Sequence, residues 1–244
     1  MTRSTSSRRR LRATCGKLGR CESGLALTEF AFALPVLLTL CMAGLETANF
    51  AMAHLRISNI AMLAADNAAR VRDSIDEADI VELMTGAKMT GANLNFAQNG
   101  RIILTDLEAA NADGTRQWIR WQRCDGAFNV APSYGRPLTA GGAAITNGTE
   151  FFRNDRTTAS ANPSSPDQST MTGMGPPDKR ISSAPATAVM VVEVVYRYQP
   201  IIPNGLLNNR EIRYETAFNV RQRTDQSLRN AGLITPRSCD RFVA

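Results

Sequence analysis

Glu29 is an acidic residue within the apolar run "SGLALTEFAFALP" at residues 23–35, where an ionised carboxylate requires an explanation. An ionised acid at the centre of a membrane helix costs roughly 2.5–3.5 kcal/mol on insertion scales. Inside lipid this carboxylate therefore needs a cationic or hydrogen-bonding partner. If it lies at the edge of the membrane, it can instead reach the headgroups.

Residues that could carry catalysis or bind a cofactor do not form a recognisable pattern. The chain has one histidine, His54, and no Cys/His spacing typical of a metal site. It also lacks a phosphate-binding glycine loop, G-x-S-x-G and H-E-x-x-H. The acidic residues of 73–82 are typical of a solvated helix face rather than of a Ca²⁺ site. We therefore expect a protein that is not an enzyme, with no metal, no cofactor and no small-molecule substrate.

The positive charge is confined to the first 24 residues. They contain seven Lys and Arg against one Glu, which accounts for the whole formal net charge of +6. The remaining chain is neutral and has no electrostatic footprint for nucleic acid, so we expect no nucleic-acid partner. Residues 1–24 are predicted to form a basic, disordered leader.

The apolar run that follows predicts one membrane span. Residues 25–53 are long enough to cross the ~30 Å hydrocarbon core as a helix, and residues 30–45 contain no charge. Lys and Arg cluster on its N-terminal side, which predicts a cytoplasmic N-terminus. The C-terminal part, residues 54–244, is then expected on the opposite side of the membrane.

Two other interpretations of this run stay open. It could be a cleaved signal peptide with Ala51-Met52-Ala53 before the cut, although the run exceeds a usual h-region. It could also be the buried helix of a soluble protein, which leaves the charge asymmetry unexplained.

The order of the leader, Gly24, "LALTEF" and a long apolar helix resembles the prepilin leader of type IV pilins and pseudopilins. Within that group, "ALTEFAFALPVLLTLCMAGLE" is most similar to the TadE-like (TadE/TadG) proteins. The matching positions include Glu29, Phe30, Leu34, Pro35 and Glu46.

The resemblance implies a set of roles for individual residues. A prepilin peptidase would cut between Gly24 and Leu25, and Glu29 would pair with the new amine of Leu25 in its own or a neighbouring chain. Leu25 and Glu29 lie one helical turn apart, as such a pair requires. Glu29, Phe30 and Pro35 would then serve assembly. Pro35 removes a helical N–H, which predicts a local kink.

The predicted topology separates the five cysteines. Cys15 and Cys21 lie in the reducing leader and Cys41 lies in the membrane. Cys124 and Cys239 alone lie where oxidation is allowed, so a disulfide between them is the favoured interpretation and two free thiols the alternative. The bridge would close a loop of over 100 residues, worth about 4–5 kcal/mol in the chain-entropy model.

The helical spacing of apolar residues continues beyond the membrane to about residue 72. Ser74 and Glu77 form a capping-box pattern before a second helix, which is expected to run to about Met84 and to be stopped by Gly86 and Gly91.

The remaining pattern is that of strands. Residues 101–108 and 116–124 flank the turn signal "NADG", and residues 187–198 and 210–221 alternate in the same way. Residues 131–186 are predicted to form a long, partly mobile loop. A small antiparallel sheet packed on the long helix predicts an α+β fold of pilin-like arrangement.

Two functional classes follow. The first is a structural pseudopilin or assembly factor of a tight-adherence (Flp-type) pilus in the bacterial inner membrane, with a periplasmic domain and other pilus or pseudopilin subunits as partners. The second is a membrane-anchored envelope binding protein unrelated to pili. Its candidate surface includes Trp118 and Trp121, although their spacing in a strand favours core packing.

Overall fold

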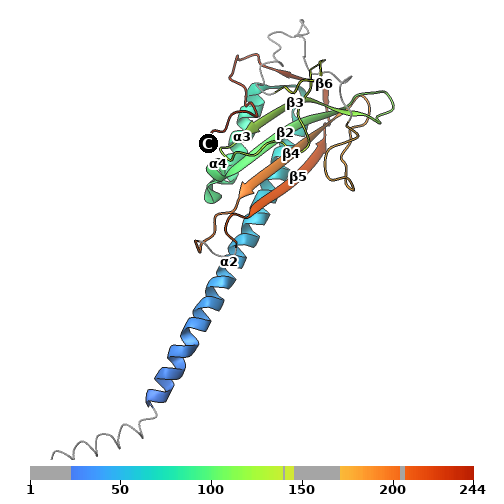
Figure 1. The fold of residues 1–244 in the computed structure, drawn as a ribbon. Helices are drawn as coiled ribbons and strands as arrows, with labels where there is room; N and C mark the ends of the chain where they lie inside the picture. Colours follow the sequence, from blue (N-terminus) through green and yellow to red (C-terminus); the bar gives the residue numbers. More distant parts are fainter. Residues whose placement is uncertain (1–22, 140, 146–170, 204–206) are drawn as a thin grey trace, which may run out of the picture. The chain divides into compact units, whose positions relative to one another are not determined.

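A computed structural model describes residues 23–139, 141–145, 171–203 and 207–244 of the chain (Figure 1). The chain divides into two compact units, Met1–Asn49 and Phe50–Ala244. The predicted leader, residues 1–24, lies outside the described residues up to position 22. The 146–170 part of the predicted loop 131–186 also lies outside them.

Helix α2 (Ser23–Arg70) is the longest element and contains Pro35. By length and composition it can cross a membrane. Within the first unit its large apolar side chains are exposed, with Phe32 80% and Leu25 72% exposed. Within the second unit one face of the helix is buried, at Ala53, Ile57, Ile60, Ala61, Ala64, Ala65, Ala68 and Ala69. The predicted apolar spacing beyond residue 53 therefore marks the buried face.

Four antiparallel strands form the main sheet in the order β3-β2-β4-β5 (Figure 1). Strands β2 (Gly100–Ala109) and β3 (Gln117–Asp125) form the predicted hairpin. Its turn is closed by side chains, because Asn111 Oδ1 accepts a hydrogen bond from the Arg116 N–H and Gly114 adopts a positive φ of 71°. Strand β4 (Ala188–Arg197) pairs with β2 and with β5 (Glu211–Asn219). The α+β class and the antiparallel sheet are thus confirmed.

Both faces of β4 are covered. Met190, Val192 and Val194 pack in one core with the buried face of α2. The alanines of α2 allow the helix backbone to approach the sheet closely. Val189 and Val191 point to the opposite face and pack with residues such as Met174. The sheet therefore lies between α2 and segments that return across its outer face.

The second helix begins and ends at residues other than those predicted. Helix α3 spans Glu77–Thr90, and its N-cap is Asp76, which accepts a hydrogen bond from the Ala78 N–H while Asp79 accepts one from the Asp76 N–H. The prediction of Ser74 as the cap was wrong, because an acidic pair two residues later makes the reciprocal bonds. Gly86 lies inside α3 and does not end it.

Short elements complete the domain. The 3₁₀ turn η1 (Ala92–Leu94) and the helix α4 (Phe96–Asn99) lead from α3 into β2. Strand β1 (Asp73–Asp76) pairs in parallel with β6 (Arg223–Arg229) in a separate two-stranded sheet. The sequence did not predict this pairing.

Candidate functional site

The predicted cleavage position lies in the first turn of α2. The Gly24–Leu25 peptide bond lies at the start of the described part of helix α2 (Ser23–Arg70). A Cβ added at Gly24 would have no neighbouring atom within 4 Å. Gly24 is therefore not required by packing among the described residues, and its low helix propensity makes unwinding of this turn inexpensive.

Glu29 lies one turn after Leu25, and both side chains are exposed. It is the one charged residue between Gly24 and Leu45. No ion pair of Glu29 is found among the described residues, whereas buried carboxylates of the second unit have such partners. The neighbouring Phe30 is 60% exposed. The structure thus brings Gly24, Leu25, Glu29 and Phe30 together on two successive turns of a helix.

The hydroxyl groups of this half of α2 are satisfied within the helix. Thr28 donates to the Leu25 carbonyl, Thr39 to the Val36 carbonyl and Thr47 to the Ala43 carbonyl, each at 2.8 Å. Pro35 lacks an N–H and leaves the Ala31 carbonyl without its usual helical donor. A helix whose hydroxyls bond to its own backbone suits a medium without water.

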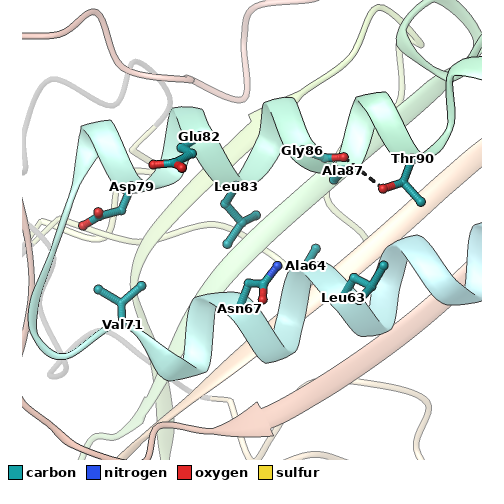
Figure 2. Close-up of a pocket in the computed structure, with 10 residues that line it drawn as sticks. All are labelled: Leu63, Ala64, Asn67, Val71, Asp79, Glu82, Leu83, Gly86, Ala87 and Thr90. Atoms are coloured by element: carbon teal, nitrogen blue, oxygen red, sulfur yellow. Dashed lines mark hydrogen bonds between the residues drawn. The ribbon is translucent and has the colours of Figure 1, made fainter.

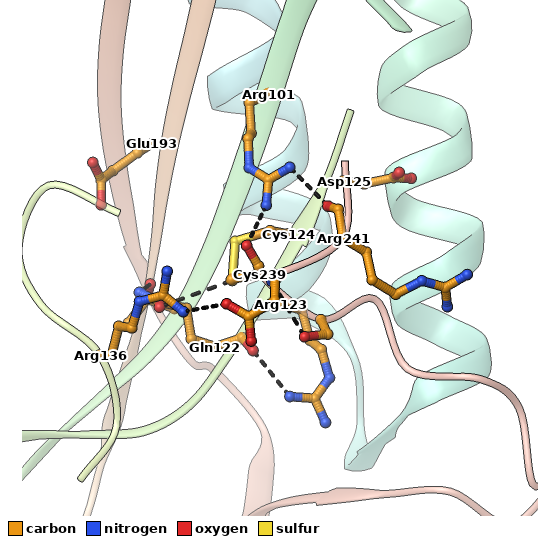
Figure 3. Close-up of a disulfide and its surroundings, with 12 residues drawn as sticks. Arg101, Gln122, Arg123, Cys124, Asp125, Arg136, Glu193, Cys239 and Arg241 are labelled. Atoms are coloured by element: carbon orange, nitrogen blue, oxygen red, sulfur yellow. Dashed lines mark hydrogen bonds and ion pairs between the residues drawn. A yellow bond between two sulfur atoms is a disulfide. The ribbon is translucent and has the colours of Figure 1, made fainter. Parts of the chain in front are cut away.

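The second site predicted from the sequence is the cysteine pair of the domain. Cys124 of β3 and Cys239 near the C-terminus form a disulfide with a Cα–Cα distance of 4.6 Å, while Cys41 is free (Figure 3). Backbone contacts strengthen this attachment, since the Cys124 N–H donates to the Arg237 carbonyl. The C-terminal segment is thereby fixed to an edge strand of the sheet.

Arg101 holds the same segment from the neighbouring strand. Its fully buried guanidinium donates to the carbonyls of Gly126, Cys239 and Arg241 at 2.9, 2.7 and 2.9 Å (Figure 3). The Phe242 ring lies 4.1 Å from the guanidinium carbon. Burial lowers the pKa of Arg101 to about 10, which leaves it charged at neutral pH. Arg101 therefore stabilises the attachment of the C-terminal segment to the sheet.

A buried ion pair joins α3 to the sheet. Arg123 of β3 donates through Nε to Glu77 Oε1 at 2.7 Å, and both side chains are fully buried. Burial raises the pKa of Glu77, and the charge of Arg123 offsets part of that effect. The sequence did not predict this pair, because Glu77 belongs to an acidic run that is typical of a solvated helix face. The sequence signal that could have indicated the ion pair is the position of Arg123 in a predicted strand, between Trp121 and Cys124.

Aromatic residues of the domain gather at the start of its α2 portion. Phe50 contacts the rings of His54 and Tyr198 edge-to-face, with centroids 4.6 and 4.9 Å apart. His54 Nδ1 lies 3.2 Å from the Tyr214 hydroxyl. His54 is thus held by aromatic neighbours. Trp121, proposed as part of a candidate binding surface, is fully buried and donates to the Gln226 carbonyl.

A groove of 460 Å³ runs between α2 and α3 (Figure 2). Its lining is apolar at Leu63, Val71 and Leu83, and the acidic residues Asp79 and Glu82 lie on the α3 side. Asp79 already accepts a hydrogen bond from the N-cap. The ten lining residues include no histidine, cysteine or lysine that could act as a nucleophile or a general base. Among the described residues no group of three His, Cys, Asp or Glu could hold a metal ion.

A comparison with protein families finds a match, and it covers helix α2. The family model described as TadE-like protein matches residues 24–70, which is nearly the whole of this helix. The resemblance of the apolar segment to TadE-like proteins is thereby confirmed, and this family suggests an association with pilus machinery in general. No curated protein and no solved structure matches the chain.

Proposed function

We propose that this chain is a structural, non-enzymatic component of a tight-adherence (Flp-type) pilus system, acting as a minor pseudopilin or assembly factor. The observation that carries the proposal is the TadE-like match over residues 24–70. That segment contains the glycine, the acid, the aromatic residue and the proline on which the resemblance rests.

The location proposed is the bacterial inner membrane, with a cytoplasmic leader and a periplasmic domain. The exposed apolar side chains of residues 25–45 and the internally bonded threonine hydroxyls support a single membrane span. The basic residues before Gly24 support the orientation. The disulfide between Cys124 and Cys239 fits an oxidising compartment.

Glu29 is proposed to act in assembly. After a cut behind Gly24, the amine of Leu25 would lie one helical turn away from Glu29, in reach within the same chain or from a neighbouring subunit. A carboxylate that obtains its partner only after processing would fix the register of one helix against another. The partners are then other pilus or pseudopilin subunits, together with a prepilin peptidase.

A non-enzymatic role is supported by how the domain uses its buried charges. Arg123 and Glu77 form an ion pair, and Arg101 donates through both terminal nitrogens to backbone carbonyls. Both arginines fix segments of the fold and neither faces the groove between α2 and α3.

The cleavage proposal is tested by the variant Gly24→Arg in a host that contains the prepilin peptidase. We expect the wild type to lose residues 1–24 and the variant to keep them, as seen by immunoblot of the C-terminal domain. Thr2→Arg is the matched control, because it adds the same charge to the leader far from the cut. Identical mobility of wild type and Gly24→Arg would contradict the proposal.

The assembly role of Glu29 is tested separately with Glu29→Gln. This variant keeps the shape of the side chain and removes its charge, so we expect normal processing but reduced recovery in the pilus-assembly fraction. Glu22→Gln makes the same change in the leader and should have no effect. Recovery of Glu29→Gln in this fraction at the wild-type level would contradict the proposed ion pair.

A further inference from the structure

The groove between α2 and α3 is long and has a helix on each side (Figure 2). Helix α2 lines it from Leu63 to Val71 and α3 lines it from Asp79 to Thr90, and the two helices run in opposite directions. Measured along α3, the groove is about 16 Å long at 1.5 Å per residue. That is the length of about three turns of a helix, so the groove matches a second helix in length.

The groove presents apolar side chains to water. Leu63 is 49% exposed, and Val71 and Leu83 are only partly buried against the core of the domain. The neighbouring residues Met62 and Met89 are also exposed, Met89 at 73%. Exposed apolar surface that is contiguous in this way is typical of a site of protein interaction.

Gly86 is not explained by packing within the domain. It lies inside α3, where a glycine lowers the stability of the helix relative to alanine. A Cβ added at Gly86 would meet no atom within 4 Å among the described residues, so no neighbouring element requires a glycine here. Together with Ala64 and Ala87, Gly86 leaves room for the backbone of a second helix to approach closely.

Charge distinguishes one side of the groove from the other. Asp79 and Glu82 lie on the α3 side, and no cation of the described residues forms an ion pair with either of them. Basic residues of the same two helices already have acidic partners, in the pairs Arg70–Asp66 and Lys88–Asp125. A partner that brings Lys or Arg to this side would therefore find acids that can pair with it.

These features favour a helix of another protein over a small molecule or a second copy of this chain. Small-molecule sites direct several polar groups toward one ligand, whereas the Thr90 hydroxyl here bonds to the Gly86 carbonyl of its own helix. The α3 helix of a second copy would bring Asp79 and Glu82 against the same acids. An amphipathic helix that lays its apolar face in a groove has neither difficulty.

We propose that the groove between α2 and α3 binds one amphipathic helix of a different protein, with its apolar side chains in the groove and Lys or Arg along the side that carries Asp79 and Glu82. The inference concerns the domain that starts at Phe50 and depends neither on the pilus role nor on a cut behind Gly24. It goes beyond the proposed function, because it assigns a docking surface and the chemistry of the partner.

The test places a photoreactive side chain in the groove of the full chain in its native host. p-Benzoylphenylalanine replaces Leu63, and the peptides that become cross-linked on irradiation are sequenced by mass spectrometry. We expect a segment of another protein with apolar residues three and four positions apart and with Lys or Arg beside them. Thr85 is the control position, because it is exposed on α3 outside the groove lining, and a probe there should give several-fold less of this cross-link.

Two variants that carry the probe at position 63 test the shape and the charge of the groove. Gly86→Leu fills the groove and Glu82→Lys reverses its charge, and each should lower the yield of the cross-link several-fold. Thr85→Leu and Glu211→Lys are the matched controls, since they introduce the same side chains at exposed positions outside the groove. Gly86→Leu should unfold thermally at no lower temperature than the wild type, because leucine favours a helix more than glycine does.

Several results would overturn the inference. A probe at position 63 that cross-links to a second copy, to lipid or to a segment without basic residues contradicts the proposed partner, and so does the lack of any cross-link. An unchanged yield in Glu82→Lys contradicts the role of charge, and an unchanged yield in a folded Gly86→Leu contradicts binding in the groove. If Gly86→Leu unfolds at a lower temperature than the wild type, the yield in Glu82→Lys decides.

Discussion

The two units of the chain differ in which side chains they expose and which they bury. Residues 25–45 expose their leucines and phenylalanines and contain one acid, Glu29. The domain that starts at Phe50 buries its apolar side chains in three clusters and also buries charged residues such as Arg101, Arg123 and Asp106. A helix with exposed apolar side chains is stable in lipid, whereas a domain with a polar surface is stable in water.

The acids of the two units sharpen this difference. Glu77 lies in an apolar interior and has Arg123 as a partner in the same chain. Glu29 lies in an apolar segment, and among the described residues no cation is paired with it. Glu77 thus has its cation within the domain, whereas the partner proposed for Glu29 is an amine that processing or assembly would supply.

The largest effect on the domain is expected from loss of its covalent link. Cys124→Ser combined with Cys239→Ser should lower the free energy of unfolding by about 4–5 kcal/mol, because the bridge closes a loop of over 100 residues in the unfolded chain. Urea unfolding followed by tryptophan fluorescence in detergent measures this. Cys41→Ser is the control and should leave the transition unchanged. A double variant that unfolds at the wild-type urea concentration would show that the noncovalent contacts of the C-terminal segment, those of Arg101 among them, hold it without the disulfide.

A similar loss is expected when the buried ion pair is broken on one side. Arg123→Ala leaves Glu77 buried without its cation, at a cost of about 3–5 kcal/mol. Replacing both residues, as Arg123→Met with Glu77→Leu, should restore most of the stability, since no buried charge remains. The comparison of the two variants by urea unfolding isolates the charge from the packing. If the single variant were as stable as the double variant, Glu77 would have a partner other than Arg123.

Asp106 provides a test that depends on pH. Both of its carboxylate oxygens are buried without a hydrogen-bond partner among the described residues, and burial raises its pKa well above the ordinary value. A raised pKa in the folded state means that the stabilising contribution is complete below the unfolded pKa and is lost as the pH rises through the folded pKa. Asp106→Asn should therefore gain stability over the wild type as the pH increases.

The control for this prediction is Asp113→Asn in the β2–β3 turn. Asp113 is exposed and accepts hydrogen bonds from the backbone and hydroxyl of Thr115, which lower its pKa. Its contribution is present above the unfolded pKa and is lost as the pH falls, so its variant should lose stability at neutral pH. Unfolding curves over a pH series measure both signs. If the stabilities of the wild type and Asp106→Asn changed with pH in the same way, burial would not raise the pKa of Asp106.

The smallest effect concerns the cap of α3. Asp76→Ala should cost about 1 kcal/mol, because its carboxylate is the N-cap acceptor, and Asp76 also accepts a hydrogen bond from the Ala231 N–H. Ser74→Ala, at the position predicted from the sequence, should change the unfolding free energy far less. A larger effect for Ser74→Ala than for Asp76→Ala would reverse the assignment of the cap.

Sequence patterns predicted the elements whose signals are local. Turn residues and alternation located the β2–β3 hairpin, and the three-and-four spacing in α2 marked its buried face. The parallel pairing of β1 with β6 could not be predicted, because "DSID" offers one apolar residue, Ile75, and its partner strand lies about 150 residues away. Arg101 was likewise hidden, since its partners are backbone carbonyls that leave no pattern in the sequence.

The intact mass of the protein, isolated from its native host without reduction, reports both the processing of the leader and the state of the disulfide. We expect a chain that begins at Leu25 and carries one disulfide between Cys124 and Cys239. A mass for a chain that begins before Gly24 would contradict the processing that gives Glu29 its partner. A chain that begins at His54 would contradict the membrane anchor, because the apolar half of α2 would then be a discarded signal peptide.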